Sequence, residues 1–183
     1  MRRFGVVVCV LVLVMSSLPS WGSEIDAERD EVVRTGMTLL GGAAGLAVGA
    51  SIGLAFSLDA IDTPLSNTLL LTIPVAAVGA ATGALAGYWI ADVTLRHRPA
   101  FLWSILEGAG LGVVAGAFVG AITFPTNFVI AHAVLEVPEG YWGRFEYLPT
   151  LGMAVLAGGV WGGVFGAMAG AVTVPILSLV VGF

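Results

Sequence analysis

The feature that most constrains this chain is glycine repeated at every fourth position within four apolar stretches. Residues spaced by four lie close to one face of an α-helix, so each stretch would carry a strip without side chains. Lipid tails provide no hydrophobic force between helices, and association there depends on close backbone approach. The four glycine ladders are Gly41, Gly45, Gly49 and Gly53; Gly79, Gly83 and Gly87; Gly108, Gly112, Gly116 and Gly120; and Gly158, Gly162, Gly166 and Gly170.

The composition places these stretches in a membrane. Hydrophobic residues occupy 58% of the 183 positions and charged residues 10%, against about 25% charged in soluble domains. Four segments, 37–57, 69–93, 102–131 and 151–180, reach the roughly 20 apolar residues that cross a bilayer core. We therefore expect an all-α membrane protein, a four-transmembrane-helix glycine-zipper bundle that forms one domain over 23–183.

The N-terminal residues 1–22 are typical of a secretory signal peptide, with two early arginines, a short apolar core and small residues at Ser20 and Gly22. An uncleaved anchor is the alternative. Either a cleaved signal or an anchor places the residues that follow it outside the cytoplasm. The membrane itself is expected to be a bacterial plasma membrane. With four spans both ends lie outside, and so does the turn with Arg96 and Arg98, although arginine favours the cytoplasmic side. We expect the signal to decide the orientation.

An internal repeat relates the middle of the third segment to the middle of the fourth. Residues 111–125 and 161–175 align without gaps, with eight of fifteen positions identical, and both end in Thr-x-Pro. The first segment aligns with the third at an offset of 67, and the second with the fourth at an offset of 83. This pattern predicts a duplicated helical hairpin. Convergence on one packing rule is the alternative.

The ladders allow two arrangements. All four could be buried between helices of one monomer, or one could face outward and build an oligomer or a pore. The expected partners are the lipid bilayer and either a second copy of the chain or a membrane-complex subunit.

Three Thr-x-Pro motifs, at Thr72, Thr123 and Thr173, place proline within or beside the apolar segments. Each proline removes a helical hydrogen bond and frees the carbonyl four residues earlier, which threonine, water or another helix can satisfy. The motifs indicate either kinks in long helices or broken helices that line a site. The freed carbonyls belong to Leu70, Ala121 and Ala171.

Glu107 lies about six residues into the third segment, or about 9 Å along a helix. An acid at that depth is a functional hypothesis, facing the bundle interior or a hydrated pocket. With the three threonines it forms a possible intramembrane polar site. The alternative is an interfacial acid paired with Arg96 or Arg98. Asp92, four residues before Arg96, predicts an ion pair at a helix end.

Two polar segments flank the spans. The acidic stretch 24–34 is expected to be a solvated, helix-compatible leader to the first span. The connection between the third and fourth segments carries Tyr141, Trp142, Phe145 and Tyr147, which are typical of a segment on the membrane surface. A partner-binding loop is the alternative for that connection.

Several classes of chemistry have no motif here. The chain has no H-E-x-x-H, G-x-S-x-G or P-loop pattern, so we expect neither enzymatic activity nor a cofactor. His97 and His132 lie at opposite ends of one segment, so no metal site is expected. The formal net charge is −5 and lysine is absent, which argues against nucleic acid as a partner.

The four glycine-striped segments resemble glycine-zipper membrane proteins as a broad class. In number of spans and spacing of small residues the chain is also similar to the Tim17/Tim22/Tim23 translocase family, a resemblance that carries over no site residues. We expect an integral membrane structural or assembly protein that acts through tight glycine-mediated helix packing. A small channel or transporter, with a path past Glu107 and the proline-broken helices, is the alternative.

Overall fold

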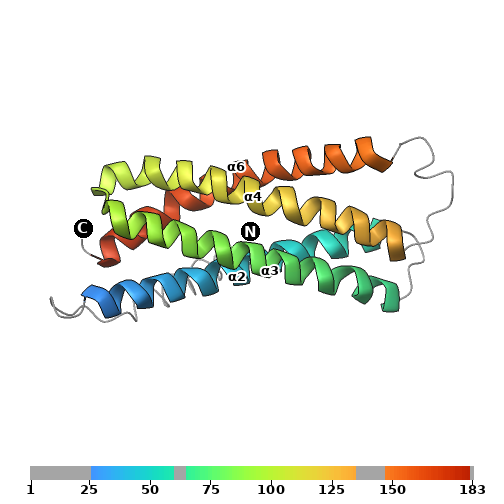
Figure 1. Ribbon diagram of the computed structural model, residues 1–183, viewed down its shortest axis with the longest axis horizontal. Helices are drawn as coiled ribbons and strands as arrows, with labels where there is room; N and C mark the ends of the chain where they lie inside the picture. The colour runs from blue at the N-terminus through green and yellow to red at the C-terminus, as the bar shows by residue number, and fades with distance from the viewer. Residues whose placement is uncertain (1–25, 60–64, 135–146, 182–183) are drawn as a thin grey trace.

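The computed structural model describes residues 26–59, 65–134 and 147–181, and every regular element within them is an α-helix (Figure 1). The helices are α2 (Asp26–Asp59), α3 (Leu65–His97), α4 (Phe101–Val134) and α6 (Tyr147–Val181). The predicted all-α architecture of four membrane-length helices is confirmed. The signal peptide expected at 1–22 and the aromatic connection before Tyr147 lie outside the described residues.

Each helix is longer than the apolar segment predicted within it. The four contain 33 to 35 residues, or about 50 Å at 1.5 Å per residue, against a hydrocarbon core of about 30 Å. Part of each helix must therefore tilt within the bilayer or project beyond it. The stretches long and apolar enough to cross a membrane are Glu28–Ala55, Asn67–His97, Phe101–Ala133 and Thr150–Leu179.

The acidic leader is not separate from the first span. Helix α2 begins at Asp26 and runs without interruption into the apolar residues. No proline lies between residues 26 and 57, so nothing forces a break where the composition changes. The charged turns and the apolar turns therefore belong to one continuous helix.

The helices form two antiparallel hairpins, α2 with α3 and α4 with α6. A three-residue turn, Arg98 to Ala100, joins them (Figure 1). Arg98 adopts φ 44° and its backbone N–H donates to the Thr94 carbonyl at 2.9 Å. This left-handed residue with a bond four positions back ends α3 as an αL cap, and Pro99 prevents the helix from continuing.

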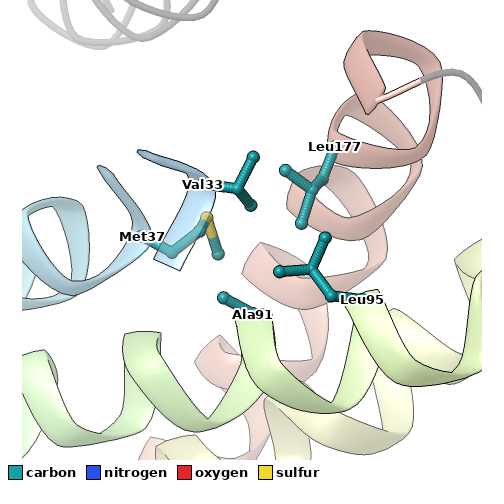
Figure 2. Close-up of a cluster of buried hydrophobic side chains, with 5 residues drawn as sticks. All are labelled: Val33, Met37, Ala91, Leu95 and Leu177. Carbon is teal, nitrogen blue, oxygen red and sulfur yellow. The ribbon is translucent and has the colours of Figure 1, made fainter. Parts of the chain in front are cut away.

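A buried apolar cluster connects the two hairpins at the end that carries this turn. Its side chains come from α2, α3 and α6 and point toward one another (Figure 2). The members are Val33, Met37, Ala91, Leu95 and Leu177. Most large apolar side chains elsewhere are exposed, as expected for a surface whose solvent is lipid.

The prolines do not interrupt their helices. Pro74, Pro125 and Pro175 each lie inside a helix that continues past them. Of the two alternatives, broken helices are therefore wrong, while kinks within continuous helices stay a prediction. A single missing N–H removes one helical hydrogen bond, and the packed partner helix holds the remaining turns in place.

Candidate functional site

The first two ladders meet each other along the α2–α3 interface. A Cβ added at Gly41 would overlap the carbonyl oxygen of Gly83, and one added at Gly83 would overlap that of Gly41. Gly45 and Gly79 show the same reciprocal relation. The hydrogen atom of glycine is what allows these backbones to touch.

The ladder of α2 extends past the glycines of α3. A Cβ at Gly49 would lie 2.9 Å from the Cα of Ala76, and one at Gly53 would lie 2.7 Å from the Cα of Thr72. At the opposite end, a Cβ at Gly87 would overlap the carbonyl oxygen of Met37. Close backbone contact therefore spans about five helical turns.

The other two ladders meet along the α4–α6 interface, and here glycine faces glycine at every step. The four pairs are Gly108–Gly170, Gly112–Gly166, Gly116–Gly162 and Gly120–Gly158. In each pair a Cβ on either residue would overlap the carbonyl oxygen of the other. All fifteen ladder glycines thus face the partner helix of their own hairpin, and no ladder in the described helices is left for an outside partner.

Glycines outside the ladders show that this closeness is selective. A Cβ at Gly36, Gly110 or Gly152 would have nothing within 4 Å. Gly159 and Gly163 would accept a Cβ at ordinary contact distances of 3.8 and 3.6 Å. The spacing in the sequence therefore distinguishes interface glycines from outward ones.

An apolar groove of about 450 Å³ lies on the outer side of the α4–α6 hairpin. Both helices contribute small and large apolar residues to its lining. It is lined by Val113, Ala117, Gly159, Val160, Gly163, Val164, Ala167 and Met168. It contains no charged side chain, and its surface matches lipid tails.

The two hairpins differ in register. The offsets of 67 and 83 equate Gly41 with Gly108 and Gly87 with Gly170. Because Gly108 faces Gly170, a faithful copy would place Gly41 nearest Gly87, but Gly41 lies nearest Gly83, one helical turn away. The duplicated hairpin stays a prediction, and under these offsets the two hairpins pair one helical turn apart.

Among the described residues, the ion-pair partner of Glu107 is a histidine. Its Oε1 lies 3.1 Å from Nδ1 of His97, the last residue of α3. The expected pairing with Arg96 or Arg98 is therefore wrong in its partner. The contact crosses the short α3–α4 turn, with His97 exposed and Glu107 partly buried, as expected for an acid near the end of a span.

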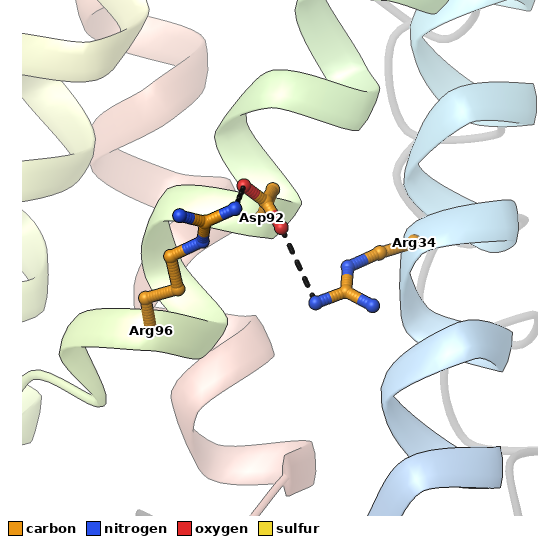
Figure 3. A network of polar contacts seen from close by, with 3 residues as sticks. All are labelled: Arg34, Asp92 and Arg96. Atoms are coloured by element: carbon orange, nitrogen blue, oxygen red, sulfur yellow. Dashed lines mark ion pairs between the residues drawn. The ribbon is translucent and has the colours of Figure 1, made fainter.

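Asp92 forms the centre of a charged network between α2 and α3 (Figure 3). The predicted pair with Arg96 is confirmed at 2.7 Å. Sequence reasoning missed the second partner, Arg34 of α2, at 3.2 Å. Antiparallel pairing of Gly41 with Gly83 brings Arg34 near Asp92, so the ladder register was the available signal.

The proposed intramembrane polar residues do not all lie together. Glu107 and Thr123 are sixteen residues apart on α4, or about 24 Å along the axis. Thr72 packs against Gly53 of α2. Thr173 donates to the Ala169 carbonyl at 2.8 Å, two residues before the carbonyl that Pro175 frees.

Further polar side chains, outside the proposed intramembrane site, lie at both ends of α4. Ser178 of α6 donates to Ser104 of α4 at 3.5 Å, and both are buried. Near the other end, Asn127 is fully buried and Phe128 stacks on His132 at 6.3 Å between centroids. The spacing of small residues gives no indication of these contacts.

No three or more His, Cys, Asp or Glu side chains lie close enough to hold a metal within the described residues. The fold and this geometry define a class: a multi-pass membrane protein of four helices arranged as two close-packed hairpins. The chain matches no protein-family model, no curated protein and no solved structure. The resemblance to the Tim17/Tim22/Tim23 family therefore gains no support beyond four apolar helices.

Proposed function

We propose that this protein is a structural or assembly component of a membrane, acting through glycine-mediated helix packing. The observation that carries the proposal is the reciprocal contact of ladders in both hairpins, with Gly112 and Gly166 as an example. Helices this close gain many dispersion contacts. A membrane protein whose four glycine ladders are all used in packing between its own helices suits a scaffold role better than a role in chemistry.

The outward faces support contact with lipid or with partner helices. Leu102, Leu156 and Met168 are examples of large apolar side chains that are well exposed. Because the ladders are already used within the chain, a partner would bind these outer faces. We place the protein in a bacterial plasma membrane, on the strength of the predicted signal peptide.

A transport path receives less support. Glu107 is engaged by His97 near a helix end, and Thr123 lies about 24 Å from it along α4. We therefore do not propose a channel.

The packing half of the proposal is tested with Gly116→Leu and its matched control Gly110→Leu. A Cβ at Gly116 would lie 2.8 Å from the Cα of Gly166, whereas one at Gly110 has open space. Overpacking of this kind costs about 1–3 kcal/mol or more, and an outward substitution stays within about 0.5 kcal/mol. Thermal unfolding in detergent measures the difference, and equal stability of the two variants would contradict the proposal.

The assembly half of the proposal is tested by measuring the mass of the detergent-extracted protein. The wild-type protein, extracted in mild detergent, is expected to co-purify with a companion or as an oligomer of defined size. A monodisperse monomer without a companion would reject assembly and leave the packing result unaffected.

A further inference from the structure

Two polar side chains on one face of α4 have no hydrogen-bond partner among the residues that the structure describes. Thr123 and Asn127 are one helical turn apart, and each is fully buried, with none of its surface exposed. The hydroxyl of Thr123 and both the oxygen and the nitrogen of the Asn127 amide lack a hydrogen bond. Buried polar groups are nearly always hydrogen-bonded, so an unpaired amide beside an unpaired hydroxyl requires an explanation.

The orientation of Thr123 is unlike that of most hydroxyls in these helices. Thr38, Thr82, Thr126 and Thr173 each donate to the carbonyl four residues earlier, at 2.7–2.8 Å. That bond is available to any helical threonine. Thr123 does not make it, so its hydroxyl remains available to a group outside its own helix backbone.

We propose that Thr123 and Asn127 bind a small neutral ligand that both donates and accepts hydrogen bonds, and that this ligand is water. The amide nitrogen needs an acceptor, while the amide oxygen needs a donor. A metal cation would satisfy only the oxygen atoms, and an anion only the nitrogen and the hydroxyl. Side chains four apart on a helix are about 5–6 Å apart at Cβ, a span that one water can bridge, and buried waters typically make two to four such bonds.

This site makes one part of the bundle polar and hydrated, away from the Glu107–His97 contact. It is independent of the proposed function, since a scaffold and a transporter could each contain it. It also explains why an amide is buried in a helix that is otherwise largely apolar.

The experiment uses the wild-type chain in lipid nanodiscs. The sequence contains two asparagines, Asn67 and Asn127, so selective ¹⁵N-asparagine labelling gives two side-chain amide signals. Asn67→Ser assigns them. We expect magnetisation transfer from water to the Asn127 amide protons, weakened at least threefold in Thr123→Val and unchanged in the control Thr126→Val.

Three outcomes would overturn the proposal. The first is the absence of magnetisation transfer from water to the Asn127 amide in the wild-type protein. This measurement does not depend on the folding of any variant. The second is a saturable shift of the Asn127 signal when Na⁺ or K⁺ replaces choline, which would assign the site to a cation. The third is equal transfer in Thr123→Val and the wild type, which would remove Thr123 from the site.

Discussion

Asp92 forms ion pairs that link the two helices of the first hairpin, α2 and α3. It accepts from Arg96 on its own helix and from Arg34 across the interface. The two arginines differ in environment, because the Arg96 side chain is 72% exposed and the Arg34 side chain 33%. An exposed pair four residues apart contributes about 0.3–0.5 kcal/mol, whereas a partly buried pair between helices loses less to solvent screening.

We predict that Arg34→Gln destabilises the protein more than Arg96→Gln does. The expected losses are about 1 kcal/mol for Arg34 and under about 0.5 kcal/mol for Arg96. Thermal unfolding of both variants in one detergent, at low and at high salt, provides the measurement. Equal effects, or a larger effect for Arg96, would show that the Arg34–Asp92 ion pair stabilises the fold no more than the exposed Arg96–Asp92 pair does.

At the scale of the helices, the two interfaces are of different kinds. Within each hairpin the contact is backbone against backbone, because the ladders remove the side chains. Between hairpins the contact is made by side chains, with Leu177 of α6 inserted among residues of α2 and α3 (Figure 2). The cluster should therefore respond to loss of side-chain volume, whereas the ladders should respond to its gain.

Leu177→Ala and Leu179→Ala test this cluster. Leu177 is 1% exposed, and Leu179, two residues on, is 66% exposed. Truncation of Leu177 leaves a cavity and is expected to cost about 2 kcal/mol, while lipid refills the space left by Leu179. Unfolding midpoints in nanodiscs compare the two, and a similar loss for both would place Leu177 outside the core.

At the scale of the whole molecule, the helix order sets which groups share a membrane side. The α3–α4 turn, the start of α2 and the end of α6 lie at one end of the bundle (Figure 1). The charged groups Arg34, Asp92, Arg96, His97 and Glu107 lie toward that end. The side of the membrane on which one of them lies therefore decides the orientation of all of them.

We predict that this end faces the outside of the cell. In a Cys9→Ser background, His97→Cys should react with a membrane-impermeant maleimide in intact cells, because a secretory signal directs the following residues outward. A cysteine at Asn67, in the first turn of α3, is the internal control and should react only after lysis. Labelling in the reverse order would show that Arg96 and Arg98 set the orientation through the positive-inside tendency.

Much of the architecture was predictable because it rests on local spacing. Apolar length defined four spans, and a glycine every fourth residue defined the face on which each helix packs. The pair Asp92–Arg96 was equally predictable, since both residues belong to one helix. These features depend on positions within a few turns of each other, which the order of residues specifies directly.

The tertiary structure decided the features that depend on which helices meet and in what register. It paired ladder with ladder inside each hairpin, and brought Arg34 to Asp92. It gave Glu107 a histidine as its partner, carried the helices through their prolines, and left Thr123 and Asn127 buried together. A glycine strip fits any other glycine strip at several registers one turn apart, as the two hairpins show. The choice among them depends on side chains distant in sequence that become neighbours only when the bundle has formed.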